Sequence, residues 1–135
     1  MTHVTEMLKA HPRGARVGDQ EKLAACIAAC YECSQTCTAC ADACLSEPSA
    51  GELTSCISTD QDCADICLAT GRVLSRLTGE NTALVRAALS ACIEATQACA
   101  KECEQHAEMH DHCRICAEAC RRCESACQEL LSTLS

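Results

Sequence analysis

The fold is decided by the stretch CIAACYECSQTCTACADAC, which runs from Cys26 to Cys44. Its cysteines are spaced alternately four and three residues apart, at Cys26, Cys30, Cys33, Cys37, Cys40 and Cys44. Leucine and isoleucine usually occupy this spacing in a bundle helix. At about 100° per residue, such side chains follow one narrow stripe of a helix, about 27 Å long. The stretch therefore predicts a helix with one face lined by sulfur.

A row of cysteines could simply fill a core, because a free thiol behaves as a small apolar side chain. Leucine, valine and isoleucine fill a core better, however, and they do not oxidise. The row therefore indicates that the chemistry of sulfur is required. Related spacings recur later in the chain, at Cys56, Cys63, Cys67, Cys92, Cys99, Cys103, Cys113, Cys116, Cys120, Cys123 and Cys127.

The chain has 135 residues, enough for one domain, with 17 cysteines, one tyrosine and neither phenylalanine nor tryptophan. Its formal net charge of −8 argues against partners such as nucleic acid or anionic membranes. No apolar run approaches the roughly 20 residues of a membrane span, and the N-terminal residues show no apolar signal core and no twin arginine. We expect a cytoplasmic protein, in which thiols stay reduced and abundant cysteine indicates metal binding.

The helical patterns predict an all-α fold, with a short helix or flap over residues 1–18 and a four-helix bundle over residues 19–135. The expected helices span about 19–46, 50–77, 81–106 and 111–133. Asp19 is a suitable N-cap for the first long helix, and Pro48 ends it. Ser49 and Glu52 form a capping box before the second. Short connections favour an antiparallel up-down-up-down bundle with a cysteine-lined core.

The two ends of such a bundle differ in chemistry. One end collects an apolar plug without cysteine: Leu23, Ile27, Val73, Leu74, Leu77, Leu84, Val85, Leu89, Leu130, Leu131 and Leu134. The opposite end collects thiols, imidazoles and a thioether, all of which bind metals. We predict His106, Met109 and His110 as metal ligands at this open mouth. A solvated position is the alternative for Met109 and for His112.

Two residues stand where a cysteine would continue the spacing on the second and third long helices, namely Asp60 and Thr96. A buried carboxylate is costly unless a cation meets it. Asp60 is therefore either a metal ligand or a residue at a wet end of the bundle, and both alternatives stay open.

Copper(I) suits this sulfur better than other metals. Structural zinc and iron–sulfur clusters take four convergent ligands, often from turns or loops, which continuous helical rows do not favour. Cu(I) is soft and prefers thiolate, and cysteines three or four residues apart lie within bridging reach of one ion. Because each ion displaces about one thiol proton, the core stays near neutral as it fills. This predicts storage of multiple Cu(I) ions, at about one per cysteine or more.

The rows Cys26 to Cys44 and Cys113 to Cys127, with the cysteines between them, resemble the bacterial copper storage proteins over roughly residues 19–134. The resemblance implies a four-helix bundle that stores many Cu(I) ions and assembles as a homotetramer. Without a twin-arginine signal, the chain is similar to the cytosolic branch of that family. That branch implies histidines at the mouth, which His106 and His110 match. The physiological copper donor and acceptor are not identified by the sequence.

No catalytic constellation accompanies the cysteines. No single cysteine is distinguished, and no serine–histidine–aspartate set, phosphate loop or carboxylate pair appears. The chain is therefore predicted not to be an enzyme. The alternatives to copper storage are a thiolate sink for zinc or cadmium and a thiol redox protein.

Overall fold

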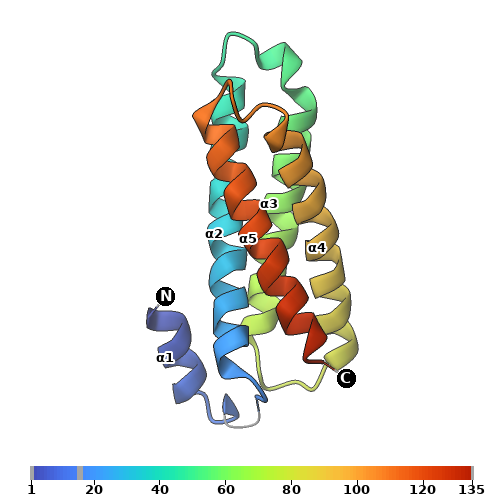
Figure 1. The fold of residues 1–135 in the computed structure, drawn as a ribbon. Helices are drawn as coiled ribbons and strands as arrows, with labels where there is room; N and C mark the ends of the chain where they lie inside the picture. Colours follow the sequence, from blue (N-terminus) through green and yellow to red (C-terminus); the bar gives the residue numbers. More distant parts are fainter. Residues whose placement is uncertain (1, 15–16, 135) are drawn as a thin grey trace.

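The computed structural model describes residues 2–14 and 17–134. Within these residues the chain forms no β-strand and five α-helices (Figure 1): α1 (Thr2–Ala10), α2 (Gln20–Leu45), α3 (Thr54–Ser75), α4 (Thr82–Glu104) and α5 (Asp111–Ser132). The predicted all-α fold with a short N-terminal helix is confirmed. None of the described helices is both long and apolar enough to cross a membrane.

The bounds of α2 follow from local chemistry. The Asp19 side chain accepts a hydrogen bond from Lys22 N at 3.0 Å, so it caps the helix as predicted. The helix ends at Leu45, before Pro48, which cannot donate a backbone hydrogen bond and disfavours helical geometry in the residue before it.

The predicted capping box before α3 is wrong. Ser49 makes no side-chain cap hydrogen bond, and a short 3-10 helix, η2 (Ala50–Glu52), follows it. The α-helix itself begins at Thr54, after Leu53, whose side chain is 2% exposed. Burial of Leu53 under the helices stabilises this turn more than a local cap does.

Each long helix packs against two others: α2 against α3 and α5, and α4 against α3 and α5. Figure 1 shows these four helices side by side. Their core consists largely of sulfur, because all 17 cysteines are buried. Small residues permit the close approach of α3 to α2: at Gly71 a Cβ atom would lie only 3.1 Å from the Tyr31 ring.

The end of the bundle at the start of α2 is apolar but less closed than predicted. Leu84 is 50% exposed, so its assignment to the apolar plug is wrong. A cavity of about 470 Å³ also opens at this end, lined in part by Leu23, Leu74, Leu77, Val85, Leu130 and Leu134. Five of the predicted plug residues are buried: Leu23, Ile27, Leu74, Leu89 and Leu130.

Candidate metal centre

The four long helices bring their cysteines together in one column of sulfur. All 17 are free thiols, and each is at most 2% exposed. At one end of the column the Sγ atoms of Cys26 and Cys127 lie 3.6 Å apart, and at the other those of Cys44 and Cys113 lie 4.0 Å apart. The alternating spacing of four and three residues produces this column, because it keeps each cysteine on the inward face of its helix.

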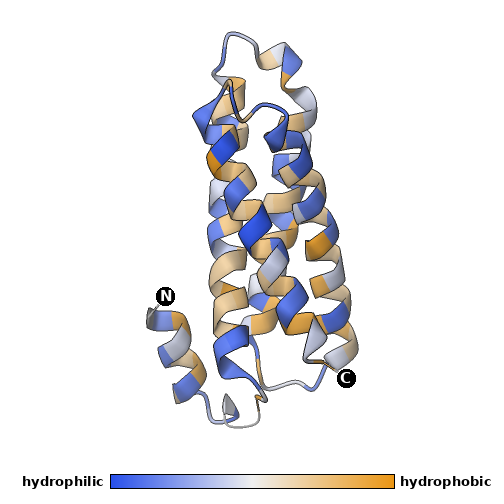
Figure 2. Ribbon diagram, viewed as in Figure 1, coloured by the Kyte–Doolittle hydropathy of each residue, from blue (hydrophilic) through white to orange (hydrophobic). Residues whose placement is uncertain are grey.

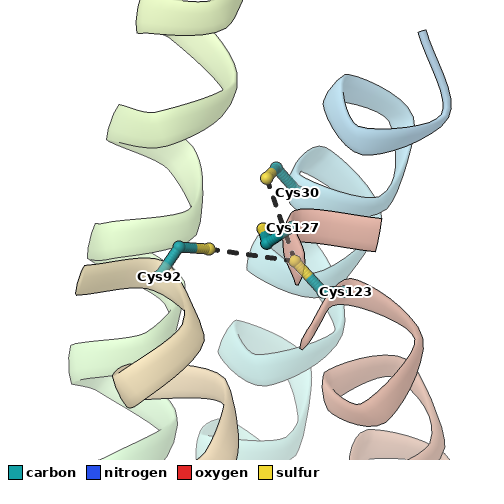
Figure 3. A group of neighbouring side chains, drawn as sticks. All are labelled: Cys30, Cys92, Cys123 and Cys127. Atoms are coloured by element: carbon teal, nitrogen blue, oxygen red, sulfur yellow. Dashed lines mark hydrogen bonds between the residues drawn. The ribbon is translucent and has the colours of Figure 1, made fainter. Parts of the chain in front are cut away.

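Groups of four sulfurs form where facing helices meet. In the group of Figure 3, Cys30 of α2, Cys92 of α4, and Cys123 and Cys127 of α5 point toward one another. The Cys123 Sγ atom lies 3.8 Å from that of Cys30 and 3.9 Å from that of Cys92. Helical rows thus bring four sulfurs close together where three different helices complete the group.

The groups also share members. Cys37 and Cys120 each belong to two groups of four possible ligands, and so do Cys40 and Cys116. Within each group the ligand atoms lie within 4.8 Å of one another. A thiolate that belongs to two groups can bridge the ions held by each. The column is therefore suited to a connected chain of metal ions more than to separate four-sulfur sites.

Asp60 lies inside this column, with no exposed surface. Its Oδ1 atom is 3.0, 3.2 and 3.5 Å from the Sγ atoms of Cys99, Cys116 and Cys103. Burial raises the pKa of the Asp60 carboxyl to about 9, and the neighbouring Cys99 adds to this effect. The carboxyl is therefore neutral at pH 7 in the metal-free protein. The alternative of a position at a wet end is wrong.

Thr96, the other interruption of the spacing, is also fully buried. Its hydroxyl donates a hydrogen bond to the Cys92 carbonyl oxygen at 2.8 Å, one turn earlier in α4. The hydroxyl is thus satisfied by its own helix, and Thr96 fills the core without needing a metal ion.

His112 connects the sulfur column to the surface. Its Nδ1 atom lies 3.5, 3.6 and 4.0 Å from the Sγ atoms of Cys40, Cys113 and Cys44. Its Nε2 atom lies 2.9 Å from Glu47 Oε2. Partial burial opposes a charge on the ring, but hydrogen bonds with Cys40 and Glu47 outweigh it and raise the pKa of His112. The Nδ1 atom of His112 thus lies beside three thiols, and its Nε2 atom lies beside a carboxylate.

The residues predicted at the mouth lie at this end but make other contacts. His110 Nδ1 is 2.9 Å from Glu47 Oε2, and His106 Nε2 is 3.8 Å from Glu102 Oε1. Met109 is 72% exposed. In Figure 2 the connection between α4 and α5, which carries these residues, is coloured as hydrophilic. It lies at the opposite end of the bundle from the start of α2 and the end of α5.

Sequence reasoning left His112 open, although it is the histidine closest to the sulfur. The signal was present: His112 precedes Cys116 by four residues and so shares its face of α5. Spacing could not show that His110, two residues earlier, turns toward Glu47, because His110 precedes the first helical residue.

Burial keeps the Cys44 and Cys113 thiols at the mouth protonated. It raises the pKa of the Cys44 thiol to about 11 and also raises the pKa of Cys113. A metal ion that binds these sulfurs must therefore displace protons, and its own charge replaces theirs. The buried core can accept cations in this way without accumulating negative charge.

Comparisons with known proteins agree with this chemistry. A family model described as copper storage protein matches residues 19–132. The copper storage protein Ccsp from Streptomyces lividans, loaded with 10 copper equivalents, is 56% identical, with a TM-score of 0.93 over 96% of this chain and 98% of that chain. A structure described as a cytosolic copper storage protein from Streptomyces lividans, with five coppers, is 60% identical, with a TM-score of 0.84 over 85% and 96% of the two chains. The uncharacterized cysteine-rich protein YhjQ of Bacillus subtilis is 34% identical over 106 residues, which are 78% of this chain and 93% of that protein.

Proposed function

Because the chain belongs to the copper storage protein family, we propose that it stores multiple Cu(I) ions on its core thiolates and so sequesters excess copper. The observation that carries this proposal is the sharing of cysteines between neighbouring four-ligand groups. Cu(I) is soft, and thiolates are its preferred ligands. Shared thiolates let each added ion build on sulfurs that already hold another, so the column fills progressively.

The proposed ligand set has two parts. The core part is the column of all 17 cysteines with the buried carboxyl of Asp60. The mouth part is His106, Met109, His110 and His112, of which His112 lies against the thiols of Cys40, Cys44 and Cys113. Imidazole and thioether groups can capture an ion at the surface and pass it to thiolates, which bind it more tightly.

The proposal also includes the setting of the protein. The N-terminal part with α1 is a flap, and α2 to α5 form an antiparallel up-down-up-down bundle; of the predicted ranges 1–18 and 19–135, residues 1, 15, 16 and 135 lie outside the described residues. Four copies assemble as a homotetramer in the cytoplasm, as the family resemblance implies. The proposed protein is not an enzyme, because no single buried cysteine is distinguished as a catalytic residue and all of them serve as metal ligands. Size-exclusion chromatography with light scattering tests the tetramer.

Titration of the reduced protein with Cu(I), in competition with a chromogenic chelator, tests storage. We expect saturation at about one ion per cysteine or more, with thiolate coordination. Saturation near four ions, each with four sulfur ligands, would contradict it. Circular dichroism of the metal-free protein is expected to be helical already, because apolar thiols and the leucine-rich end form a packed core without metal.

Stopped-flow loading tests where copper enters. Replacement of both His106 and His110 by alanine is expected to slow early uptake and leave total capacity nearly unchanged. The control variant carries Leu77→Ala and Leu130→Ala at the opposite end, which should lower stability through a cavity and barely change early uptake. Faster loading of the leucine variant, with no change in the histidine variant, would show that copper enters at the leucine-rich end instead.

A zinc or cadmium sink is the second candidate, because the sulfur spacing in one group also fits these ions. A Zn–S bond of about 2.3 Å places tetrahedral sulfurs about 3.8 Å apart, and the Sγ atoms of Cys33, Cys63 and Cys120 have this spacing, at 3.8 to 4.0 Å. Equilibration with equal Cu(I) and Zn(II), followed by metal analysis, separates the two. Retention of zinc in preference to copper supports the sink.

A further inference from the structure

Glu47 joins the two histidines nearest the sulfur column. It lies in the connection between α2 and η2, whereas His110 and His112 lie at the start of α5. One carboxylate oxygen, Oε2, is 2.9 Å from His110 Nδ1 and 2.9 Å from His112 Nε2. The two imidazole rings stack, with centroids 5.4 Å apart and planes 22° apart. A single acidic side chain thus holds both rings from the facing connection.

The carboxylate decides where the protons of these rings lie. The oxygens of a carboxylate can only accept hydrogen bonds, and Glu47 Oε2 lies 2.9 Å from His110 Nδ1 and from His112 Nε2. Each facing ring nitrogen must therefore carry a proton. In its neutral form each ring has only one N–H, so in the neutral rings His112 Nδ1 and His110 Nε2 keep their lone pairs.

These two lone pairs point to different tasks. His112 Nδ1 is the atom that lies 3.5 and 3.6 Å from the Sγ atoms of Cys40 and Cys113. His110 has its Nδ1 on Glu47 and therefore keeps the lone pair of Nε2, on the other side of the ring, for a metal ion. His112 thus has its free nitrogen, Nδ1, beside the thiols, and His110 has its free nitrogen, Nε2, on the side of the ring away from Glu47.

We propose that Glu47 is a positioning residue for copper acquisition, which selects the Nδ1 atom of His112 and the Nε2 atom of His110 as the ligands for Cu(I). This inference rests on the proposed storage of copper. Carboxylates that accept a hydrogen bond from a metal-binding histidine orient the ring and fix its tautomer, and their loss commonly weakens metal binding about 10- to 100-fold. Glu47 serves two rings in this way at once.

Nitrogen-15 NMR of the histidine side chains tests the positioning without copper. At about pH 8, where imidazole is ordinarily neutral, we expect His112 in the reduced, metal-free protein to carry its proton on Nε2 only. Glu47→Ala should give a mixture of the two tautomers. Glu47→Gln should retain the wild-type tautomer, because its amide oxygen also accepts a hydrogen bond. Retention of a single His112 tautomer in Glu47→Ala overturns the inference.

Copper loading tests the consequence. Glu47→Ala should weaken binding of the first Cu(I) ions by about 10-fold or more and slow the first phase of loading, whereas Glu47→Gln should stay near wild type and total capacity should not change. Glu52→Ala, which removes an exposed carboxylate from the adjacent η2, is the matched control. Tautomers that change without any effect on early loading would also overturn the inference. Failure of the wild-type core to bind Cu(I) at all would instead refute storage and leave the tautomer result unaffected.

Discussion

Replacement of Asp60 by asparagine tests the electrostatics of the sulfur column. The Asp60 carboxyl is fully buried, with its Oδ1 atom 3.0 Å from Cys99 Sγ and 3.2 Å from Cys116 Sγ. Its pKa rises from 3.8 to about 9, chiefly because burial disfavours the charged form. At pH 7 the folded, metal-free protein therefore keeps this proton, whereas the unfolded chain releases it.

The magnitude follows from the linkage between proton binding and folding. Because the unfolded chain binds fewer protons at Asp60 above pH 3.8, the contribution of Asp60 to stability is fully present below pH 3.8 and is lost as pH rises toward about 9. Each pH unit changes the free energy of unfolding by about 1.4 kcal/mol, so the loss at pH 7 reaches about 4 kcal/mol. Asparagine has nearly the same shape and does not titrate. Asp60→Asn should therefore raise the stability of the metal-free protein at pH 7 by up to about 4 kcal/mol.

Urea unfolding of the reduced, chelator-treated protein measures this effect from about pH 5 to about pH 8. The difference between Asp60→Asn and wild type should grow by about 1.4 kcal/mol per pH unit. Asp62→Asn, at an exposed position of the same helix, is the control and should run parallel to wild type. A difference between Asp60→Asn and wild type that does not vary with pH would refute the reasoning.

Three further predictions concern packing, capping and capacity. Leu89→Ala should lower the free energy of unfolding by about 2–5 kcal/mol because Leu89 is fully buried. Leu84→Ala, at a half-exposed position, should change it by less than about 0.5 kcal/mol. Equal losses for the two variants in denaturant titrations would contradict the difference in burial. Asp19→Ala should lower it by about 1 kcal/mol, because the hydrogen bond to Lys22 N is lost, and an unchanged melting curve would argue against the cap. The third variant replaces four of the 17 cysteines by serine: Cys33, Cys37, Cys116 and Cys120. It should bind about a quarter less Cu(I) without a change in circular dichroism. Undiminished capacity would argue against the column as the binding site.

The sequence alone determines much of the fold. Cysteine at alternating intervals of four and three residues occupies one face of a helix and no compact face of a strand, so the spacing predicts helices with a sulfur face. Asp19 predicts the start of α2, because an N-cap acts on backbone groups two or three residues away. The capping box predicted from Ser49 and Glu52 is wrong, because a local sequence pattern contains no information on the burial of Leu53, which depends on distant helices.

Only the tertiary structure decided the environment of Asp60 and the contacts of the histidines near the sulfur column. The sequence leaves Asp60 between a metal ligand and a wet end, and the burial of its carboxyl among cysteines of α4 and α5 removes the second alternative. His112 lies against sulfur from α2 as well as from its own helix, and Glu47 reaches it from another connection. Helical spacing reports which residues share a face of one helix, whereas burial, proton position and metal geometry depend on which faces meet. Those quantities arise from contacts between residues far apart in the chain, and they appear only when the helices are assembled.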